Sequence, residues 1–321
     1  MRLFRYFLYR LAQMLPVALL IVVINFVLIH LAPGDVSILL AGEGADPDYM
    51  QAVRERYGLD LPLVQQLGLY IGQILQGDLG LSYRTGEPVI DIIAERVPAT
   101  LLLAGTSLAI AAIVGTAIGT WISRRPGSAL DTAVTTLSIS LFSIPVFWLG
   151  LMLILLFAVN LRWLPSSGMV TIGGPREGLG RVLDIARHMV LPVIALSTVW
   201  LGQYVRLARA SVSEVLSEGY VTTARAIGYP ERTIMVRYGL RNAMLPIVTV
   251  LGLELGLLLS GAVLTETVFA WPGLGRLIYD AILARDMPII MGAFLIMSFT
   301  VMIAALLTDL LYAALDPRVR L

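Results

Sequence analysis

Long apolar stretches separated by segments that carry the charged residues dominate this chain of 321 residues. Six of them reach or approach the roughly 20 residues that a helix needs to cross the hydrocarbon core of a membrane. They cover 11–29, 97–123, 132–161, 188–205, 242–265 and 287–308, and only the fifth contains a charged side chain, Glu254. A transmembrane β-barrel instead shows alternating segments of about ten residues. The pattern predicts an all-α integral membrane protein with six transmembrane helices.

The segment 32–96, between the first two predicted transmembrane helices, carries its own helix signals. Asp46 and Pro47 are typical of a helix start, and Gly58 is typical of its end. A second amphipathic stretch covers 62–76. We therefore predict a small helical cap, which either docks another protein or only shields the helix ends. The chain then divides into three parts: a first transmembrane helix at 1–31, the cap at 32–96, and a five-helix core at 97–321.

Within the core, the segment 206–241 is long for a connection inside a membrane bundle, and long ordered loops often carry function. Its residues 219–227 predict a short helix with three apolar positions on one face: Tyr220, Ala224 and Ile227. Gly228 follows where a left-handed residue ends a helix. Such a helix either enters a groove of another protein or lies flat on the lipid surface. The spacing alone slightly favours the lipid surface.

The placement of arginine predicts the orientation in the membrane. One set of segments holds thirteen arginines against five acidic residues: 1–10, 124–131, 206–241 and the tail from 316. The other set holds ten arginines against fifteen acidic residues: 32–96, 162–187 and 266–286. Because positive charge is enriched on the cytoplasmic side of membrane proteins, we expect both termini in the cytoplasm.

Composition narrows the function further. The chain is 58% hydrophobic and 14% charged, with a mean hydropathy of +0.84, which excludes an ordinary cytosolic enzyme and a nucleic-acid-binding protein. All 23 basic residues are arginine, so the lysine of a Walker A phosphate loop is absent. There is no cysteine, and the two histidines, His30 and His188, are far apart. We therefore expect no catalytic set, no metal site and no cofactor in this chain.

Several motifs occur in order along the chain. They are His30-Leu31-Ala32-Pro33-Gly34-Asp35, Gly77-Asp78-Leu79-Gly80 with Ser82, Pro145-Val146-Phe147-Trp148-Leu149-Gly150, Glu218-Gly219-Tyr220 with Thr223-Ala224-Arg225-Ala226-Ile227-Gly228, Leu240-Arg241-Asn242-Ala243, Glu266-Thr267-Val268-Phe269, Trp271-Pro272-Gly273-Leu274-Gly275 and Leu315-Asp316-Pro317-Arg318. Together they resemble ATP-binding-cassette importer permeases, and more narrowly the dipeptide/oligopeptide/nickel permease family. One departure is Thr222-Thr223-Ala224, where many importer permeases begin with Glu-Ala-Ala. Peptide-type members often lack that glutamate.

The resemblance implies a type I importer permease fold and a permease subunit that brings peptides or a related small solute across the bacterial inner (cytoplasmic) membrane. It implies four kinds of partner besides the lipid bilayer: a second homologous permease, two ATPase subunits that bind ATP and Mg²⁺, and an extracytoplasmic binding protein. It also implies that the helix of the 206–241 loop couples to an ATPase, which reverses the preference for the lipid surface. The coupling residues are Tyr220, Thr223, Ala224, Arg225, Ile227 and Gly228.

Two residues are candidates for the translocation pathway. Pro145 either marks a kink that lines the pore or serves packing alone. Glu254 lies within a predicted transmembrane helix, where a carboxylate is a candidate for a functional group. We favour a structural, hydrogen-bonded glutamate at the interface with the partner permease. The alternative function is an ion-coupled secondary transporter with Glu254 and Asp309 as proton carriers, but the chain shows no inverted repeat of the kind common in that class.

Overall fold

The computed structural model of the chain describes residues 2–31, 35–42, 44–82, 84–175, 177–258 and 262–315. The described residues are mostly helical and contain no β-strand, apart from one isolated bridge between Leu81 and Pro88. Three sets of residues named above lie outside the described ones: Ala32-Pro33-Gly34, the tail 316–321, and the side chain of Asp309.

The N-terminal third consists of one long helix and three short ones. These are α1 (Arg2–Leu31), α2 (Val36–Ala41), α3 (Pro47–Tyr57) and α4 (Leu63–Leu75). Asp46 caps α3 and Pro47 begins it, while Gly58, at φ 59°, ends it in the left-handed conformation. The helical cap predicted from the sequence is therefore present, with its two main helices close to the expected positions.

The remaining helices form the core. They are α5 (Val89–Ile122), α6 (Ala129–Ser143), α7 (Val146–Leu153), the π-helical η1 (Ile154–Asn160), α8 (Gly178–Leu216), α9 (Gly219–Ala226), α10 (Glu231–Thr233), the π-helical η2 (Ile234–Leu240), α11 (Arg241–Leu257), α12 (Val263–Val268), α13 (Leu274–Ala284) and α14 (Met287–Leu315). Five stretches of the described chain are long and apolar enough to cross a membrane: 8–31, 89–122, 178–216, 231–256 and 287–308.

The predicted third transmembrane helix, 132–161, is not one straight helix. The α6 helix ends at Ser143, and the chain resumes as α7 and η1 after a bend of 95°. Proline disfavours a helical conformation for the residue before it and cannot donate a backbone hydrogen bond. Ile144 is accordingly extended, with φ −78° and ψ 125°, and Pro145 begins α7. The predicted kink at Pro145 is confirmed. The predicted number of six transmembrane helices holds if the bent pair α6 and α7–η1 is counted as one broken span.

The predicted fifth transmembrane helix is also displaced along the chain. It was expected over 242–265, but the continuous apolar helix covers 231–256 and α12 begins separately at Val263. The helix thus starts earlier, in the segment that the sequence places in the cytoplasmic loop. Residues 231–240, whose sequence also favours a helix leading into this span, begin it as α10 and η2.

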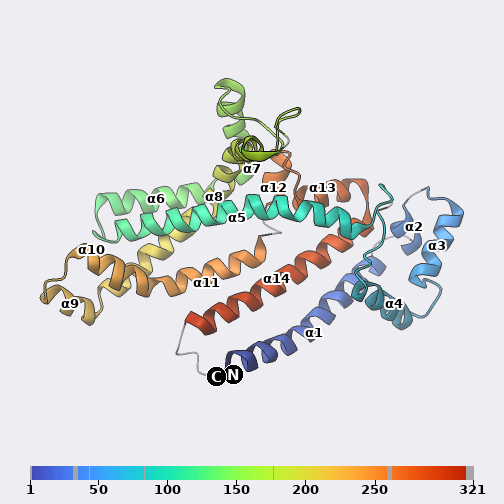
Figure 1. The fold of residues 1–321 in the computed structure, drawn as a ribbon, viewed down its shortest axis with the longest axis horizontal. Coiled ribbons are helices and arrows are strands. Elements are labelled where there is room, and N and C mark those ends of the chain that lie inside the picture. The colour runs from blue at the N-terminus through green and yellow to red at the C-terminus, as the bar shows by residue number, and fades with distance from the viewer. Residues whose placement is uncertain are drawn as a thin grey trace.

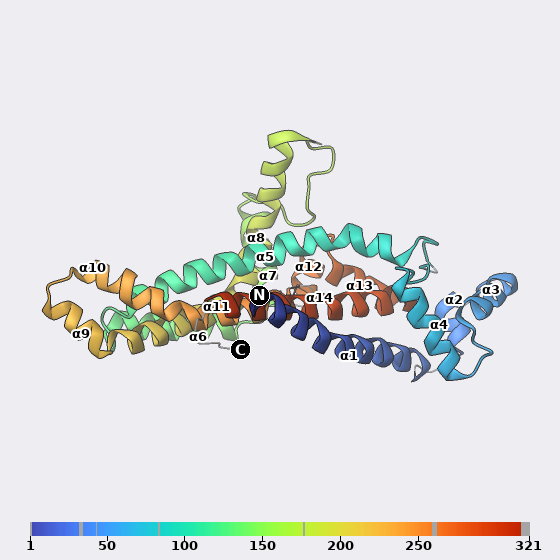
Figure 2. The same cartoon turned by 60° about the horizontal axis from the view of Figure 1, so that its bottom comes forward.

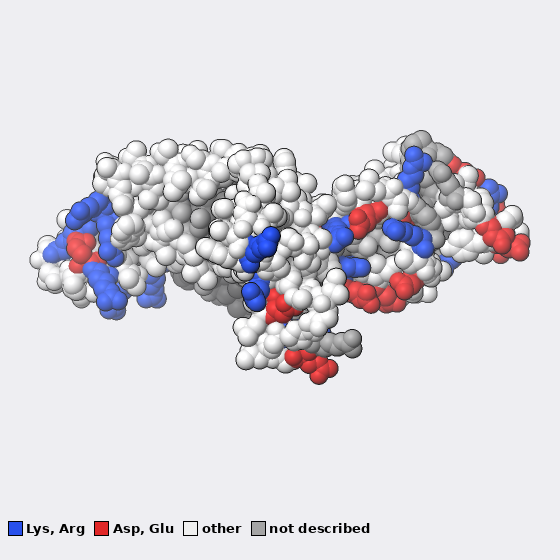
Figure 3. Space-filling view, turned by 90° about the horizontal axis from the view of Figure 1, so that it is seen from above, with Lys and Arg blue, Asp and Glu red and all other residues white. Residues whose placement is uncertain are grey.

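The long helices run side by side along the long axis of the molecule (Figure 1), with α9 and α10 at one end and α2, α3 and α4 at the other. The beginning of α8, with the loop before it, projects from the middle (Figure 2). Arginines gather at the α9 end and mixed charges lie at the cap end, while the surface between is uncharged apart from the part that projects from the middle (Figure 3). This distribution suits a protein whose middle lies in hydrocarbon.

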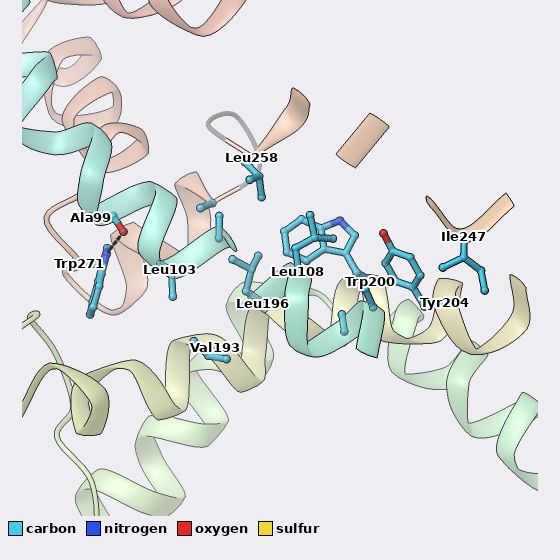
Figure 4. Packing of buried hydrophobic residues seen from close by; sticks show 14 of the residues in the cluster. Ala99, Leu103, Leu108, Val193, Leu196, Trp200, Tyr204, Ile247, Leu258 and Trp271 are labelled. Atoms are coloured by element: carbon cyan, nitrogen blue, oxygen red, sulfur yellow. Dashed lines mark hydrogen bonds between the residues drawn. The ribbon is translucent and has the colours of Figure 1, made fainter. Parts of the chain in front are cut away.

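The centre of the core is the contact between α5 and α8. A Cβ atom on Gly119 would lie 2.4 Å from the carbonyl oxygen of Val205, and one on Gly115 would lie 2.7 Å from the Cβ atom of Tyr204. Small residues let two membrane helices approach closely. Around this contact, buried apolar side chains pack into one cluster that includes Leu108, Leu196 and Trp200 (Figure 4).

Candidate functional site

The predicted coupling helix is present as α9, and its end follows from the sequence. Gly228 has φ +88°, a conformation that favours glycine. Its N–H donates to the carbonyl oxygen of Arg225 (3.0 Å), and the N–H of Tyr229 donates to that of Ala224 (3.2 Å). These bonds satisfy carbonyls at the helix end. The expected role of Gly228 as a helix terminator is confirmed.

The face of α9 that packs on the protein differs from the predicted one. Val221 and Ala224 are buried together with Ile234, against Leu216 and Tyr238. Tyr220 and Ile227 are instead 44% and 71% exposed. The prediction that Tyr220, Ala224 and Ile227 form one free apolar face is therefore wrong for Ala224. Residues three apart also share a helix face. Val221 and Ala224 are such a pair, and they form the face of α9 that is buried against Ile234.

Side-chain contacts fix α9 to its neighbours at both ends. Asn242 donates from Nδ2 to the hydroxyl of Tyr220 (3.0 Å). The Arg225 guanidinium donates from Nε to Glu231 Oε1 (2.9 Å), which ties α9 to α10. The hydroxyl of Thr223 donates to the carbonyl oxygen of Gly219 within the helix (3.1 Å). The helix is thus held in a defined position, with Thr223 and Ile227 facing away from the protein.

Glu254 has a partner within its own chain. The indole Nε1–H of Trp200 on α8 donates to Glu254 Oε2 on α11 at 2.9 Å. Tyr204, one turn further along α8, is fully buried, and its hydroxyl has no partner among the described residues. The carboxylate therefore joins two long helices, and the favoured interpretation of a hydrogen-bonded glutamate finds its partner inside the chain.

A second set of functional candidates lies toward the cap end, in the segment 266–276, which we name the outer turn. Glu266 is fully buried and accepts hydrogen bonds from the Thr100 hydroxyl (2.6 Å) and from the N–H of Arg276 (3.0 Å). Trp271, also fully buried, donates its indole N–H to the carbonyl oxygen of Ala99 (2.8 Å; Figure 4). These bonds fasten the outer turn to α5.

Two glycines of the outer turn are required by its close packing, one of them by the buried carboxylate. A Cβ atom on Gly273 would lie 2.3 Å from the Glu266 carboxylate, and one on Gly275 would lie 2.7 Å from Val263 Cα. The sequence motif from Trp271 to Gly275 therefore encodes a close approach of backbone to a carboxylate. The motif alone does not predict this role, because its Leu274 and the Thr100 hydroxyl that accepts its N–H are 174 positions apart.

The Gly77-Asp78-Leu79-Gly80 motif closes the cap in a similar way. The hydroxyl of Ser82 donates to Asp286 Oδ2 at 2.6 Å, and both residues are buried. Asp78 forms an ion pair with Arg56 on α3 and accepts the N–H of Gly80 (3.0 Å). Burial raises the pKa of Asp78, but the hydrogen bonds from Arg56 and Gly80 lower it further, so that its pKa lies below the ordinary 3.8.

The fold and these motifs define a class of protein, and comparison with known families agrees. Residues 113–321 match the family described as "Binding-protein-dependent transport system inner membrane component". Residues 3–104 match the description of the N-terminal part of such membrane components. The chain belongs to this family of membrane transport components, a permease of the binding-protein-dependent importers. Family membership favours this function over the ion-coupled secondary transporter.

Individual relatives match almost from end to end. The chain is 38% identical to the dipeptide transport system permease protein DppB of Escherichia coli (strain K12), with 98% of both proteins covered. It is 40% identical to the glutathione transport system permease protein GsiC of Escherichia coli O6:H1, again with 98% of both covered.

A solved structure shares the fold. A chain of the inward-facing MetNI methionine ABC transporter matches with a TM-score of 0.54 at 18% identity, covering 72% of this chain and 99% of that one. The expected type I importer permease fold is thereby confirmed.

Proposed function

We propose that this chain is one of two homologous permease subunits of an ATP-driven importer that carries peptides, or a related small solute, across the bacterial inner membrane. The assignment of the cargo is supported by the similarity, over nearly the full length, to two permeases whose names specify a dipeptide and glutathione. The arginine-rich α9 end lies in the cytoplasm, with both chain termini on that side, because the arginine distribution follows the positive-inside pattern.

In this proposal, α9 is the contact with an ATPase subunit. Its exposed apolar side chains, Tyr220 and Ile227, stand on the arginine-rich end of the molecule, where lipid tails cannot cover them. A short helix with such a face suits a groove on another protein. The six coupling residues then have two tasks: Tyr220, Thr223, Arg225 and Ile227 form or flank the contact, and Ala224 and Gly228 shape the helix.

Energy comes from the partner subunits. ATP and Mg²⁺ bind to two separate ATPase subunits, since this chain has no lysine with which to build a phosphate loop. An extracytoplasmic binding protein docks on the cap, where acidic residues outnumber basic ones. Closure of the ATPase pair moves α9 and shifts the two permeases between inward- and outward-open states, a two-state equilibrium biased by ligand. Glu254 and Pro145 lie on or near the resulting pathway.

Reconstitution in liposomes tests the proposal. The chain, assembled with a partner permease and two ATPase subunits, is expected to take up peptide only when ATP and the binding protein are both supplied. The chain alone is expected neither to hydrolyse ATP nor to transport. Proton-driven uptake by the chain alone would contradict the proposal and restore the secondary transporter.

A further inference from the structure

A basic groove lies at the α9 end of the protein, beside the predicted coupling helix. Its volume is about 630 Å³, and it is bounded by the α5–α6 turn, the end of α8 and the start of α10. Four guanidinium groups line it: Arg124, Arg125, Arg225 and Arg232. Glu231 is its one acidic lining residue. The formal charge of the lining is thus +3.

Three of these guanidinium groups have no partner within the described part of the chain. Arg225 is held by Glu231 at 2.9 Å. The side chains of Arg124, Arg125 and Arg232 are exposed and make no hydrogen bond or ion pair with any residue that the structure describes. Like charges gathered without counterions raise the free energy of the protein, and an anion in the groove relieves that repulsion. The groove therefore favours an anionic ligand.

The turn that presents two of the arginines is rigid. The Asp131 carboxylate accepts the N–H of Gly127 (2.9 Å) and pairs with the guanidinium of Arg209 on α8 (2.6 Å from Nη2 to Oδ2). The hydroxyl of Ser128 caps the start of α6 by accepting the N–H of Asp131 (3.2 Å). Because the turn is fixed to α8, the backbone that carries Arg124 and Arg125 is positioned before any ligand arrives, which lowers the cost of binding.

The position of the groove along the membrane normal identifies the source of the anion. Trp121, 51% exposed, lies near the end of the apolar run of α5, and exposed tryptophan is enriched at the level of lipid headgroups. Ser123 and Arg125 follow two and four residues later, in the turn just beyond the end of α5 at Ile122. The polar region of one leaflet is about 5 to 8 Å thick. The groove thus lies at headgroup level, with α9 reaching beyond it.

We propose that the basic groove binds the phosphate of an anionic phospholipid from the cytoplasmic leaflet. Arginine suits this ligand because its planar guanidinium donates two parallel hydrogen bonds to phosphate oxygens. The hydroxyls of Ser123 and Ser217, which also line the groove, already donate to the carbonyl oxygens of Thr120 (2.7 Å) and Glu214 (2.6 Å), so the arginines supply the donors to the phosphate. The inference rests on the proposed function for its orientation, since only then does the groove face the anionic leaflet. A lipid bound here fills the space between the α5–α6 turn and the base of α9.

The test uses the assembled importer in nanodiscs of phosphatidylcholine with a minor fraction of phosphatidylglycerol. Native mass spectrometry counts the phosphatidylglycerol retained on the permease. We expect the Arg124→Gln/Arg125→Gln/Arg232→Gln variant to bind it about fivefold more weakly for each arginine removed. Arg237→Gln is the matched control, because this exposed arginine is on η2 at the same end but outside the groove. It should retain phosphatidylglycerol like the wild type.

Three results would overturn the proposal. One is equal retention of phosphatidylglycerol by the triple variant. Another is displacement of the lipid by millimolar inorganic phosphate, which would indicate a site for a free anion. The third is loss of ATPase subunits from the triple variant in pure phosphatidylcholine, which would indicate a protein contact. ATP-driven uptake is measured on the same samples. Failed uptake by the wild type with lipid retention intact would reject the proposed function and leave the lipid site standing.

Discussion

The hydroxyl of Thr100 donates to the carboxylate of Glu266 at 2.6 Å, joining the middle of α5 to the outer turn. The same Thr100 oxygen accepts the N–H of Leu274 at 2.7 Å, so one side chain serves both the carboxylate and the start of α13. Removing either partner leaves buried polar groups unpaired, which costs more than the bond itself contributes.

We therefore expect Thr100→Val and Glu266→Ala each to lower the stability of the purified protein by about 1 to 3 kcal/mol. Thermal unfolding in detergent measures the change. Thr267→Val is the control, because its hydroxyl bonds only to the carbonyl oxygen of Val263 in its own helix. An unchanged melting temperature in Thr100→Val would show that the outer turn is held by packing alone.

Ile227→Asp tests the ATPase contact without disturbing the packing of α9. Ile227 is 71% exposed, so the folded permease should keep its melting temperature while ATPase association weakens by more than about 2 kcal/mol. Val236→Asp, exposed on η2, is the matched control. Co-purification of the ATPase subunits is the measurement, and normal association in Ile227→Asp would reject α9 as the contact.

Ala224→Asp and Gly228→Val should act through the shape of α9. The first places a carboxylate among the buried Val221 and Ile234, and the second forces a branched side chain to φ +88°. We expect both to abolish uptake and to increase hydrogen exchange across α9, whereas Ile227→Asp should leave exchange unchanged. Exchange at the wild-type rate in Ala224→Asp would contradict the inward placement of that residue.

Glu254→Gln should keep assembly and most of the transport. Glutamine retains an oxygen that accepts the indole N–H of Trp200, so the link between α8 and α11 survives without the charge. Uptake by the reconstituted importer is the measurement, with Trp200→Phe as the variant that removes the donor. If Glu254→Gln assembles but does not transport, the charge serves gating or cargo.

The orientation is testable because the chain contains no cysteine. Cysteines at Ser128 and Ser217, near the α9 end, should resist an impermeant thiol reagent in intact cells. A cysteine at Ser167, exposed in the loop before α8, should be labelled. Labelling at Ser217 in sealed cells would reverse the proposed orientation.

The cap should loosen in acid. Hydrogen bonds from the side chain and N–H of Ser37, with the nearby Arg54, hold the pKa of Asp35 below 3.8, and Arg56 does the same for Asp78. Carboxylates whose pKa is lowered by folding stabilise the protein fully above 3.8, and this contribution is lost as the pH falls below that value.

Hydrogen exchange of α3 and α4, corrected for the intrinsic pH dependence, should therefore accelerate below pH 3.8. Asp78→Asn should already exchange faster at neutral pH and respond less to acid. Asp60→Asn, at an exposed position in the same cap, should behave like the wild type. A pH profile unchanged by Asp78→Asn would show that its ion pair with Arg56 contributes no stability.

Local features of this fold were predictable from the sequence, and long-range contacts were not. Gly228 and the break at Pro145 follow from backbone stereochemistry that one residue determines. The inward placement of Ala224 depends on which of two apolar stripes meets Ile234, and spacing alone does not decide between them. The bond from Trp200 to Glu254 joins residues 54 positions apart, and no local rule brings them together.

The close contact of α5 with α8 has a mechanical consequence. The α5 helix contains 34 residues, a length of about 50 Å, and it is fastened to the outer turn through Thr100 while its other end lies beside the base of α9. A close-packed helix pair resists bending and transmits strain. It therefore acts as a lever: a tilt of about 5° at the α9 end displaces the far end by about 4 Å over this length. Gly115 and Gly119 keep the helix pair resistant to bending, because they allow α5 and α8 to pack this closely.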